Sequence, residues 1–250
     1  MIRAVRLEFR KLRRLRTLPI LIVLVVAVAG LSAMTLFSGS ARDAFDDPAE
    51  LPWARLLLTY TMMAAMTSPI LTAVLASRQT EIEHSGAGWL LAGSAGCSPG
   101  VLCRAKLIAL SLLLLPAVAV QTLLVIGLGA FAGIRVPLEV GPWLGYTGLL
   151  FLLDVAFLAL HIWLAATVEN QLVSVGVGML GAFLAVFSLL MPGLVSRFIP
   201  WGYYAMIAHV GQQDGGVAYL TPSYPWIAGF LVLVAAAFAL ATQRLDRLER

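Results

Sequence analysis

Six long apolar stretches constrain the fold of this chain more than any other feature of its sequence. Each approaches the roughly 20 residues that a helix needs to cross a hydrocarbon core of about 30 Å. Of the 250 residues, 60% are hydrophobic and only 12% are charged, unlike the balance of a soluble domain. In lipid, an α-helix satisfies its own backbone polar groups. The sequence therefore predicts an all-α membrane protein, a single transmembrane domain over residues 1–250 with six transmembrane helices at about 17–37, 53–77, 105–127, 143–167, 172–191 and 224–242.

The first sixteen residues are strongly basic and carry seven of the seventeen Lys and Arg residues. Apolar residues recur there at helical spacing, and a basic stripe repeats that spacing one residue later. The apolar positions are Ile2, Val5, Phe9 and Leu12. We predict an amphipathic interfacial helix over residues 1–16, with its cations among lipid headgroups. The alternative is a basic tail that only sets topology, and both interpretations place the N-terminus in the cytoplasm.

The distribution of positive charge predicts the orientation of the six spans. With both termini cytoplasmic, thirteen Lys and Arg residues lie inside and four lie outside, namely Arg42, Arg55, Arg135 and Arg197. Tryptophans mark the predicted outer ends of the spans, as expected at a membrane interface. They are Trp53, Trp143, Trp201 and Trp226.

A polar segment at 78–104, cytoplasmic in this topology, interrupts the apolar pattern between the second and third spans. It contains Glu81, Glu83 and His84, and then a short apolar patch at Trp89, Leu90 and Leu91. Ser98-Pro99 has the form of a helix start with Pro at the first helical position. We predict a short helix on the cytoplasmic face that docks on a partner. Cys97 and Cys103 match neither a disulfide framework nor a zinc site, so we expect reduced thiols.

Two segments on the predicted outer side are candidates for substrate contact. The first outer loop carries Asp43, Asp46, Asp47 and Glu50. These residues either form a solvated loop or attract cationic substrates. The segment 192–223 is predicted to dip back or to lie on the outer leaflet as short helices. There Trp201, Tyr203 and Tyr204 would offer ring faces at headgroup level.

Three polar residues fall inside predicted spans: Gln121, Asp154 and His161. Ionisable groups at membrane depth are costly, so each is either functional or a buried structural hydrogen-bonding group. Ser174, Gly178 and Ala182 form a stripe of small residues that predicts close helix packing.

Several functional classes are disfavoured by missing motifs. Neither lysine, Lys11 or Lys106, follows a glycine, so the chain has no phosphate-binding GK[ST] loop. The three histidines are scattered and no HExxH motif occurs, which argues against an enzyme and against a metal site. The basic residues lie at membrane edges rather than on a nucleic-acid-binding face. We therefore expect no catalytic residues and no bound cofactor in this chain, and any ATP chemistry would have to take place on a partner.

Four stretches carry a resemblance to a known family. They are the run from His161 to Gly181, Ile199-Pro200-Trp201-Gly202-Tyr203, Glu8-Phe-Arg-Lys11 and the Glu81-x-Glu83…Trp89…Lys106 segment. The chain resembles the permease subunits of type-2 ABC exporters, in particular the branch associated with lantibiotic immunity and bacitracin resistance.

The resemblance implies a half-transporter in a bacterial cell membrane. It would pair with a second permease, identical or related, and with two copies of a cytosolic ABC ATPase. The 78–106 segment would couple the subunits through Glu81, Glu83, His84, Trp89 and Leu90. The implied function is expulsion of a membrane-active peptide antibiotic. A general drug-efflux permease and a peptide-sensing module that does not transport are the alternatives.

Overall fold

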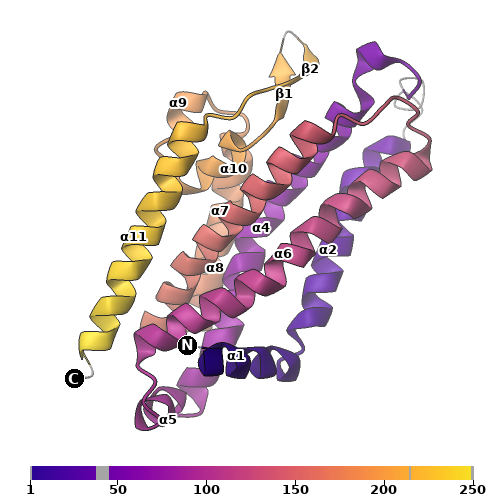
Figure 1. Ribbon diagram of the computed structural model, residues 1–250. Coiled ribbons are helices and arrows are strands. Elements are labelled where there is room, and N and C mark those ends of the chain that lie inside the picture. Colours follow the sequence, from indigo (N-terminus) through magenta and orange to yellow (C-terminus); the bar gives the residue numbers. More distant parts are fainter. Residues whose placement is uncertain (1, 38–44, 214, 249–250) are drawn as a thin grey trace.

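The computed structural model describes residues 2–37, 45–213 and 215–248, and it shows an elongated bundle of long helices (Figure 1). The predicted all-α membrane fold is confirmed, with six helical segments long and apolar enough to cross a membrane. The long helices are α2 (Thr17–Ala33), α4 (Pro52–Ser85), α6 (Pro99–Ala132), α7 (Val140–Thr167), α8 (Gln171–Ser188) and α11 (Tyr224–Leu248).

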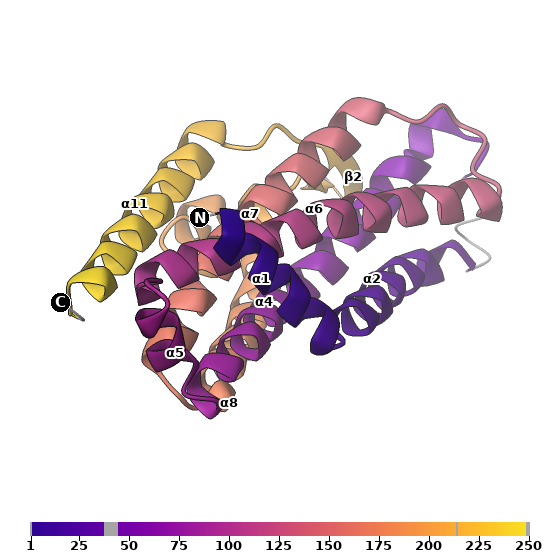
Figure 2. The same cartoon turned by 60° about the horizontal axis from the view of Figure 1, so that its bottom comes forward.

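The two ends of the bundle differ in structure. At one end, called the α5 end, lie α1 (Ile2–Arg14), α5 (Gly88–Ser94) and the C-terminal turns of α11, and α1 runs across the long helices (Figures 1 and 2). The other end, called the hairpin end, carries an antiparallel pair of strands, β1 (Val210–Gln213) and β2 (Gly216–Tyr219). The remaining short elements are η1 (Met34–Phe37), η2 (Pro48–Glu50), α9 (Gly193–Ser196), η3 (Pro200–Gly202) and α10 (Tyr203–Met206). The segment 192–223 thus contains short helices, and the hairpin beside them was not predicted.

The helices that flank α5 are longer than the predicted spans. α4 continues past residue 77 to Ser85, and α6 begins at Pro99 rather than at residue 105. The extra turns of α4 carry buried polar residues, Gln79, Thr80 and Glu83, which pack against the rest of the chain. Because these groups find partners inside the protein, the helix continues beyond its apolar part, and the connection between α4 and α6 is shorter than the predicted loop 78–104.

α4 lies at the centre of the bundle and packs against α2, α7 and α8, whereas α11 lies at its edge against α6 and α7. Large aromatic residues fill the core toward the hairpin end. The Tyr60 ring stacks on Trp143 at 6.2 Å between centroids and meets Tyr146 edge-on at 5.4 Å. Toward the α5 end the core consists of smaller apolar side chains, including Leu75, Leu110, Leu158 and Ile162.

The predicted stripe of small residues on α8 faces inward, since Ser174, Gly178 and Ala182 are buried. A Cβ atom at Gly178 would lie 2.5 Å from the Ala73 methyl and 2.8 Å from the Pro69 carbonyl oxygen. The close contact between α8 and α4 therefore requires a glycine, which has no side chain, at position 178.

We expect Gly178→Val to lower the melting temperature of the purified protein, because overpacking a tight contact costs about 1–3 kcal/mol or more. Gly176→Val is the matched control. Gly176 lies on the exposed side of the same helix, where an added Cβ meets nothing within 4 Å. Equal melting temperatures for the two variants would contradict the tight packing of α8 on α4.

Candidate functional site: the α5 end of the bundle

α5 is a single short helix held between the ends of α4 and α6 (Figure 2). Ala87 adopts a left-handed conformation, with φ of 50°, directly before the helix, and Gly96 does so after it, with φ of 76°. Ser98 then precedes Pro99, the first residue of α6, as the Ser-Pro pair predicted. The chain thus leaves α4, forms two turns of helix and enters α6 through two sharp bends.

One face of α5 is anchored to the bundle through Trp89. Its indole Nε1 donates to His84 Nδ1 at 3.4 Å, and the two rings meet edge-on with centroids 5.7 Å apart. His84 Nε2 lies 2.8 Å from the backbone carbonyl oxygen of Ala165 in α7. Both contacts are satisfied when the imidazole carries its proton on Nε2, a tautomer inferred from this geometry. Trp89 and His84 therefore connect α5 to both α4 and α7.

The opposite face of α5 is apolar and exposed. Leu90 is 78% exposed and Leu91 is 66% exposed. Gly88 allows the close approach of α5 to α4, since a Cβ there would lie 2.7 Å from the Glu83 Cα. α5 thus presents two leucines from a helix whose other side is fixed.

Behind α5 lies a buried network of charged side chains that joins α1, α4 and α6. Lys106 Nζ is fully buried and donates to Glu83 Oε1 at 2.7 Å, Glu8 Oε2 at 3.0 Å and the Gln79 carbonyl oxygen at 2.8 Å. Lys11 Nζ bridges the same two carboxylates, at 2.6 Å from Glu8 and 2.5 Å from Glu83. The network has two cations and two anions, so it is electrically neutral.

Each member of this network has several partners, as a buried charge requires. Gln79 Nε2 adds hydrogen bonds to the Glu8 carboxylate at 2.7 Å and to its backbone oxygen at 3.2 Å. Burial alone would lower the pKa of Lys11, but the carboxylates of Glu8 and Glu83 beside it raise that pKa above its usual value. The charged form of Lys11 is therefore the stable one, and α1 is fixed to the helices that flank α5.

A second polar cluster fixes α11 to the start of α6. Arg104 donates to Asp246 at 2.9 Å and to the Thr242 hydroxyl at 3.0 Å, and Ser98 Oγ donates to Asp246 at 2.5 Å. A Cβ at Gly100 would lie 2.1 Å from the Thr242 carbonyl oxygen, so the two helices touch along their backbones. Both helix ends beside α5 are thus held by charged contacts.

The predicted coupling residues gather at this end but do not share one role. Glu81 and Leu90 are exposed, while His84 and Trp89 are partly buried and hold α5 in place. Glu83 is buried and paired with Lys11 and Lys106, so it is not available to a partner surface. This corrects its predicted place on the docking surface.

The roles of Glu8, Gln79 and the two lysines were not predicted. One signal was present in the sequence, because the chain contains only two lysines among many arginines and both belong to this network. Glu8 is also the only acidic residue within the basic N-terminal helix. Neither signal indicates which residues pair, because the partners lie far apart in the chain.

The three polar residues inside the spans form hydrogen bonds with other buried groups. Asp154 accepts from the Tyr204 hydroxyl at 2.8 Å and from Ser68 at 3.3 Å. Gln121 donates to the Tyr60 hydroxyl at 3.2 Å, and His161 Nδ1 lies 3.1 Å from Ser174 Oγ. These contacts favour the structural interpretation of Gln121 and Asp154, whereas His161 Nε2 is buried without a hydrogen-bond partner among the described residues.

The acidic residues of the predicted outer loop lie at the hairpin end, except Asp43, which falls outside the described residues. Asp46 lies 3.6 Å from the Arg135 guanidinium, and Glu50 pairs with Arg55. Asp47 accepts a hydrogen bond from the Ala49 amide at 2.9 Å. The two neighbouring arginines reduce the negative potential that the sequence predicts for this loop.

The aromatic residues proposed for substrate contact are less accessible than predicted. Tyr204 is only 1% exposed because its hydroxyl bonds to Asp154 and its ring stacks on Phe157. Tyr203 is also buried, with its ring 4.1 Å from that of Phe230. Trp201 is partly buried and stacks on Phe157 at 5.6 Å. The expectation that these rings lie open at headgroup level is therefore corrected, most clearly for Tyr204.

Within the described ranges, no three His, Cys, Asp or Glu side chains gather closely enough to hold a metal ion. A search of curated proteins finds no match. The family model of the ABC-2 family transporter proteins matches residues 4–185, which include most of α1, all of α5 and the whole buried charge network. In that family this region is a membrane-embedded subunit that is not itself catalytic and that associates with an ABC ATPase. Because the match covers well over half of the chain and the six spans agree with it, this multi-pass membrane protein belongs to the ABC-2 transporter family.

Proposed function

We propose that this permease is driven by a cytosolic ABC ATPase that docks on α5. The observation that carries this proposal is the pair of exposed leucines, Leu90 and Leu91, on a helix whose opposite side is anchored by Trp89. A few side chains that fill well-packed, water-free pockets on a partner carry most of the binding energy of many interfaces. A rigidly held apolar pair suits such a pocket.

The contacts behind α5 also suit the transmission of movement. The Lys106 network ties the end of α4 to the start of α6 and to α1. A displacement of α5 by a partner would therefore move three elements together. We propose that ATP and Mg²⁺ are bound by two copies of the ATPase, and that a second permease, identical or related, completes the transporter.

This arrangement requires the α5 end to face the cytoplasm of a bacterial cell, as the positive-inside distribution predicts. Cys97 tests the orientation because it is partly exposed beside α5, whereas Cys103 is buried. In intact cells we expect a membrane-permeant maleimide to label Cys97 and an impermeant one to leave it unlabelled. Cys97→Ser should abolish labelling and Cys103→Ser should preserve it. Labelling of Cys97 by the impermeant reagent would mean that the α5 end faces the outside, opposite to the predicted topology.

We further propose that the substrate is a membrane-active peptide antibiotic taken from the outer leaflet. Asp154 and Gln121, which are buried in the bundle, form hydrogen bonds with Tyr204 and Tyr60 and do not line a polar path. Such an interior suits a substrate that is expelled from the membrane rather than passed through one subunit. Asp46 and Glu50 keep exposed side chains at the hairpin end, where they could attract a cationic peptide.

Expression with the partner ATPase in a sensitive host should raise tolerance to a cationic lanthionine peptide. Neutralising Asp46, Asp47 and Glu50 should weaken protection modestly and mainly at low ionic strength, because exposed charges are screened beyond about 8–10 Å in physiological salt. Protection against small planar drugs instead would support general drug efflux. Binding of the peptide without vectorial transport would support a sensing module.

A further inference from the structure

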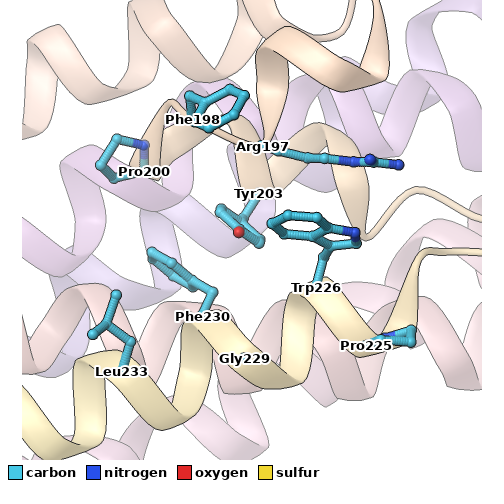
Figure 3. A pocket seen from close by; sticks show the side chains of 9 residues that line it. All are labelled: Arg197, Phe198, Pro200, Tyr203, Pro225, Trp226, Gly229, Phe230 and Leu233. Atoms are coloured by element: carbon cyan, nitrogen blue, oxygen red, sulfur yellow. The ribbon is translucent and has the colours of Figure 1, made fainter.

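A groove lies between the segment 197–203 and α11, at the hairpin end of the bundle (Figure 3). Its upper part has a volume of about 440 Å³ and is bordered by Arg197, Tyr203 and Trp226. Its lower part, of about 350 Å³, continues between α7 and α11. The two parts share Pro200, Phe230 and Leu233 in their walls, so they lie next to each other along the inner side of α11.

The lower part of the groove is lined by apolar and aromatic side chains. They include Phe157, Leu160, Val234, Ala237 and Phe238, and none of the residues that line it is charged. Aromatic contacts form the walls. The Phe230 ring stacks on Tyr203, with centroids 4.1 Å apart, and lies tilted against Phe157, with centroids 6.0 Å apart. Gly229 lines the upper part, and a Cβ atom there would have no other atom within 4 Å.

One cationic side chain, that of Arg197, lies at the upper end of this groove. The Arg197 guanidinium lies over the Trp226 ring at 5.0 Å from its centroid (Figure 3). Arg197 Nε is buried and has no hydrogen-bond acceptor. Among the described residues no carboxylate lies within ion-pair distance of Arg197, whereas Arg55, Arg104 and Arg135 all have one. No carboxylate of the described residues therefore pairs with the positive charge of Arg197.

The groove is long enough to hold an extended acyl chain. At 1.5 Å per residue, the part of α11 that lines it, from Trp226 to Ala241, spans roughly 22 Å, which is less than a hydrocarbon core of about 30 Å. Trp226 and Tyr224 begin the helix and are both exposed, as aromatic residues at headgroup level are. Arg197 thus lies where headgroups lie, and the apolar part extends toward the membrane centre.

We infer that this groove binds one anionic phospholipid, with its phosphate on Arg197 and an acyl chain between α7 and α11. A helix of a second permease, about 10 Å in diameter, occupies over two turns more than twice the 350 Å³ of the lower part. A peptide would leave backbone groups without partners there, and a cationic one would be repelled by Arg197. Only a lipid combines one anion with a chain that needs no hydrogen bonds.

Native mass spectrometry of the purified permease in detergent tests this assignment. The probes are phosphatidylglycerol and phosphatidylcholine with identical acyl chains. We expect the wild-type protein to retain phosphatidylglycerol about tenfold more strongly, the effect of a charge-assisted contact. Arg197→Gln should remove the preference, and Ala237→Phe should reduce retention of both lipids by filling the lower groove.

Two variants serve as matched controls. Arg135→Gln removes another cation at the hairpin end, from a side chain that is 81% exposed, and should keep the preference. Val232→Phe likewise places a phenyl ring on α11, but on the side away from the groove, where Val232 is 69% exposed, and should keep retention. The two lipids are compared within each variant, and retention is measured as the lipid-bound fraction of the folded permease, so partial loss of folded protein cancels.

Three results would overturn the assignment. If Arg197→Gln and Arg135→Gln lose the preference for phosphatidylglycerol equally, cations at the hairpin end attract anionic headgroups in general. Unchanged retention of both lipids in Ala237→Phe would place the lipid elsewhere. Displacement of the lipid by inorganic phosphate at equal concentration would mean that the site recognises a free anion.

Discussion

Replacing Lys106 with Met should lower the free energy of unfolding by about 3–5 kcal/mol, the usual cost of removing one partner from a buried ion pair. The Nζ atom of Lys106 is fully buried and bonds to Glu8, Glu83 and the Gln79 carbonyl oxygen. After the replacement, two buried carboxylates share one remaining cation, Lys11. Thermal unfolding in detergent should record the loss as a fall of roughly 2–4 °C per kcal/mol.

Lys11→Met is the matched control for this experiment. Lys11 contacts the same two carboxylates, but its side chain is 27% exposed, so water can partly replace it. Its loss should therefore destabilise the protein less than that of Lys106. In the double variant Lys106→Met/Glu83→Gln, which restores neutrality, the destabilisation should be smaller than the sum of the two single effects. A Lys106→Met protein as stable as the wild type would mean that the network is screened by water.

The second large effect is expected at the opposite face of α5. Changing both Leu90 and Leu91 to Asp should abolish the substrate-stimulated ATP hydrolysis of the partner subunit. The side chains are 78% and 66% exposed, so the change does not disturb the core of the permease. At an interface, however, it replaces two apolar anchors with charges that must lose their water. We expect the affinity for the ATPase to fall by about 100-fold or more, equivalent to about 2.7 kcal/mol.

The conservative pair Leu90→Met/Leu91→Met keeps the apolar surface and should retain most of the stimulation. Trp89→Ala should give an intermediate loss, because it releases α5 from His84 without changing the exposed leucines. Glu83→Lys would be a poor test of docking, since it would place a third cation beside Lys11 and Lys106 and unfold the site. Normal stimulation in the double Asp variant, with the permease correctly inserted, would refute docking through α5.

The parts of this protein that follow from local sequence patterns could be predicted. Six apolar stretches of membrane-spanning length determine the six spans, because each helix satisfies its own backbone groups in lipid. The spacing of apolar and basic residues determines α1, and Ser98-Pro99 marks the start of α6. The small residues around Gly178 predict the close contact of α8. Each of these signals lies within one helix or one turn.

The side-chain pairings were decided only by the tertiary structure. Lys106 meets Glu8 across 98 positions of the chain, and Tyr204 meets Asp154 across 50. Glu83 looked like an exposed docking residue and Tyr204 like an exposed ring, yet both are buried. The apolar pattern shows that a helix is embedded but not which neighbour each face meets, because lipid tails and apolar side chains are equally apolar. Which polar groups become partners therefore depends on how the helices pack, and this packing also forms the groove beneath Arg197.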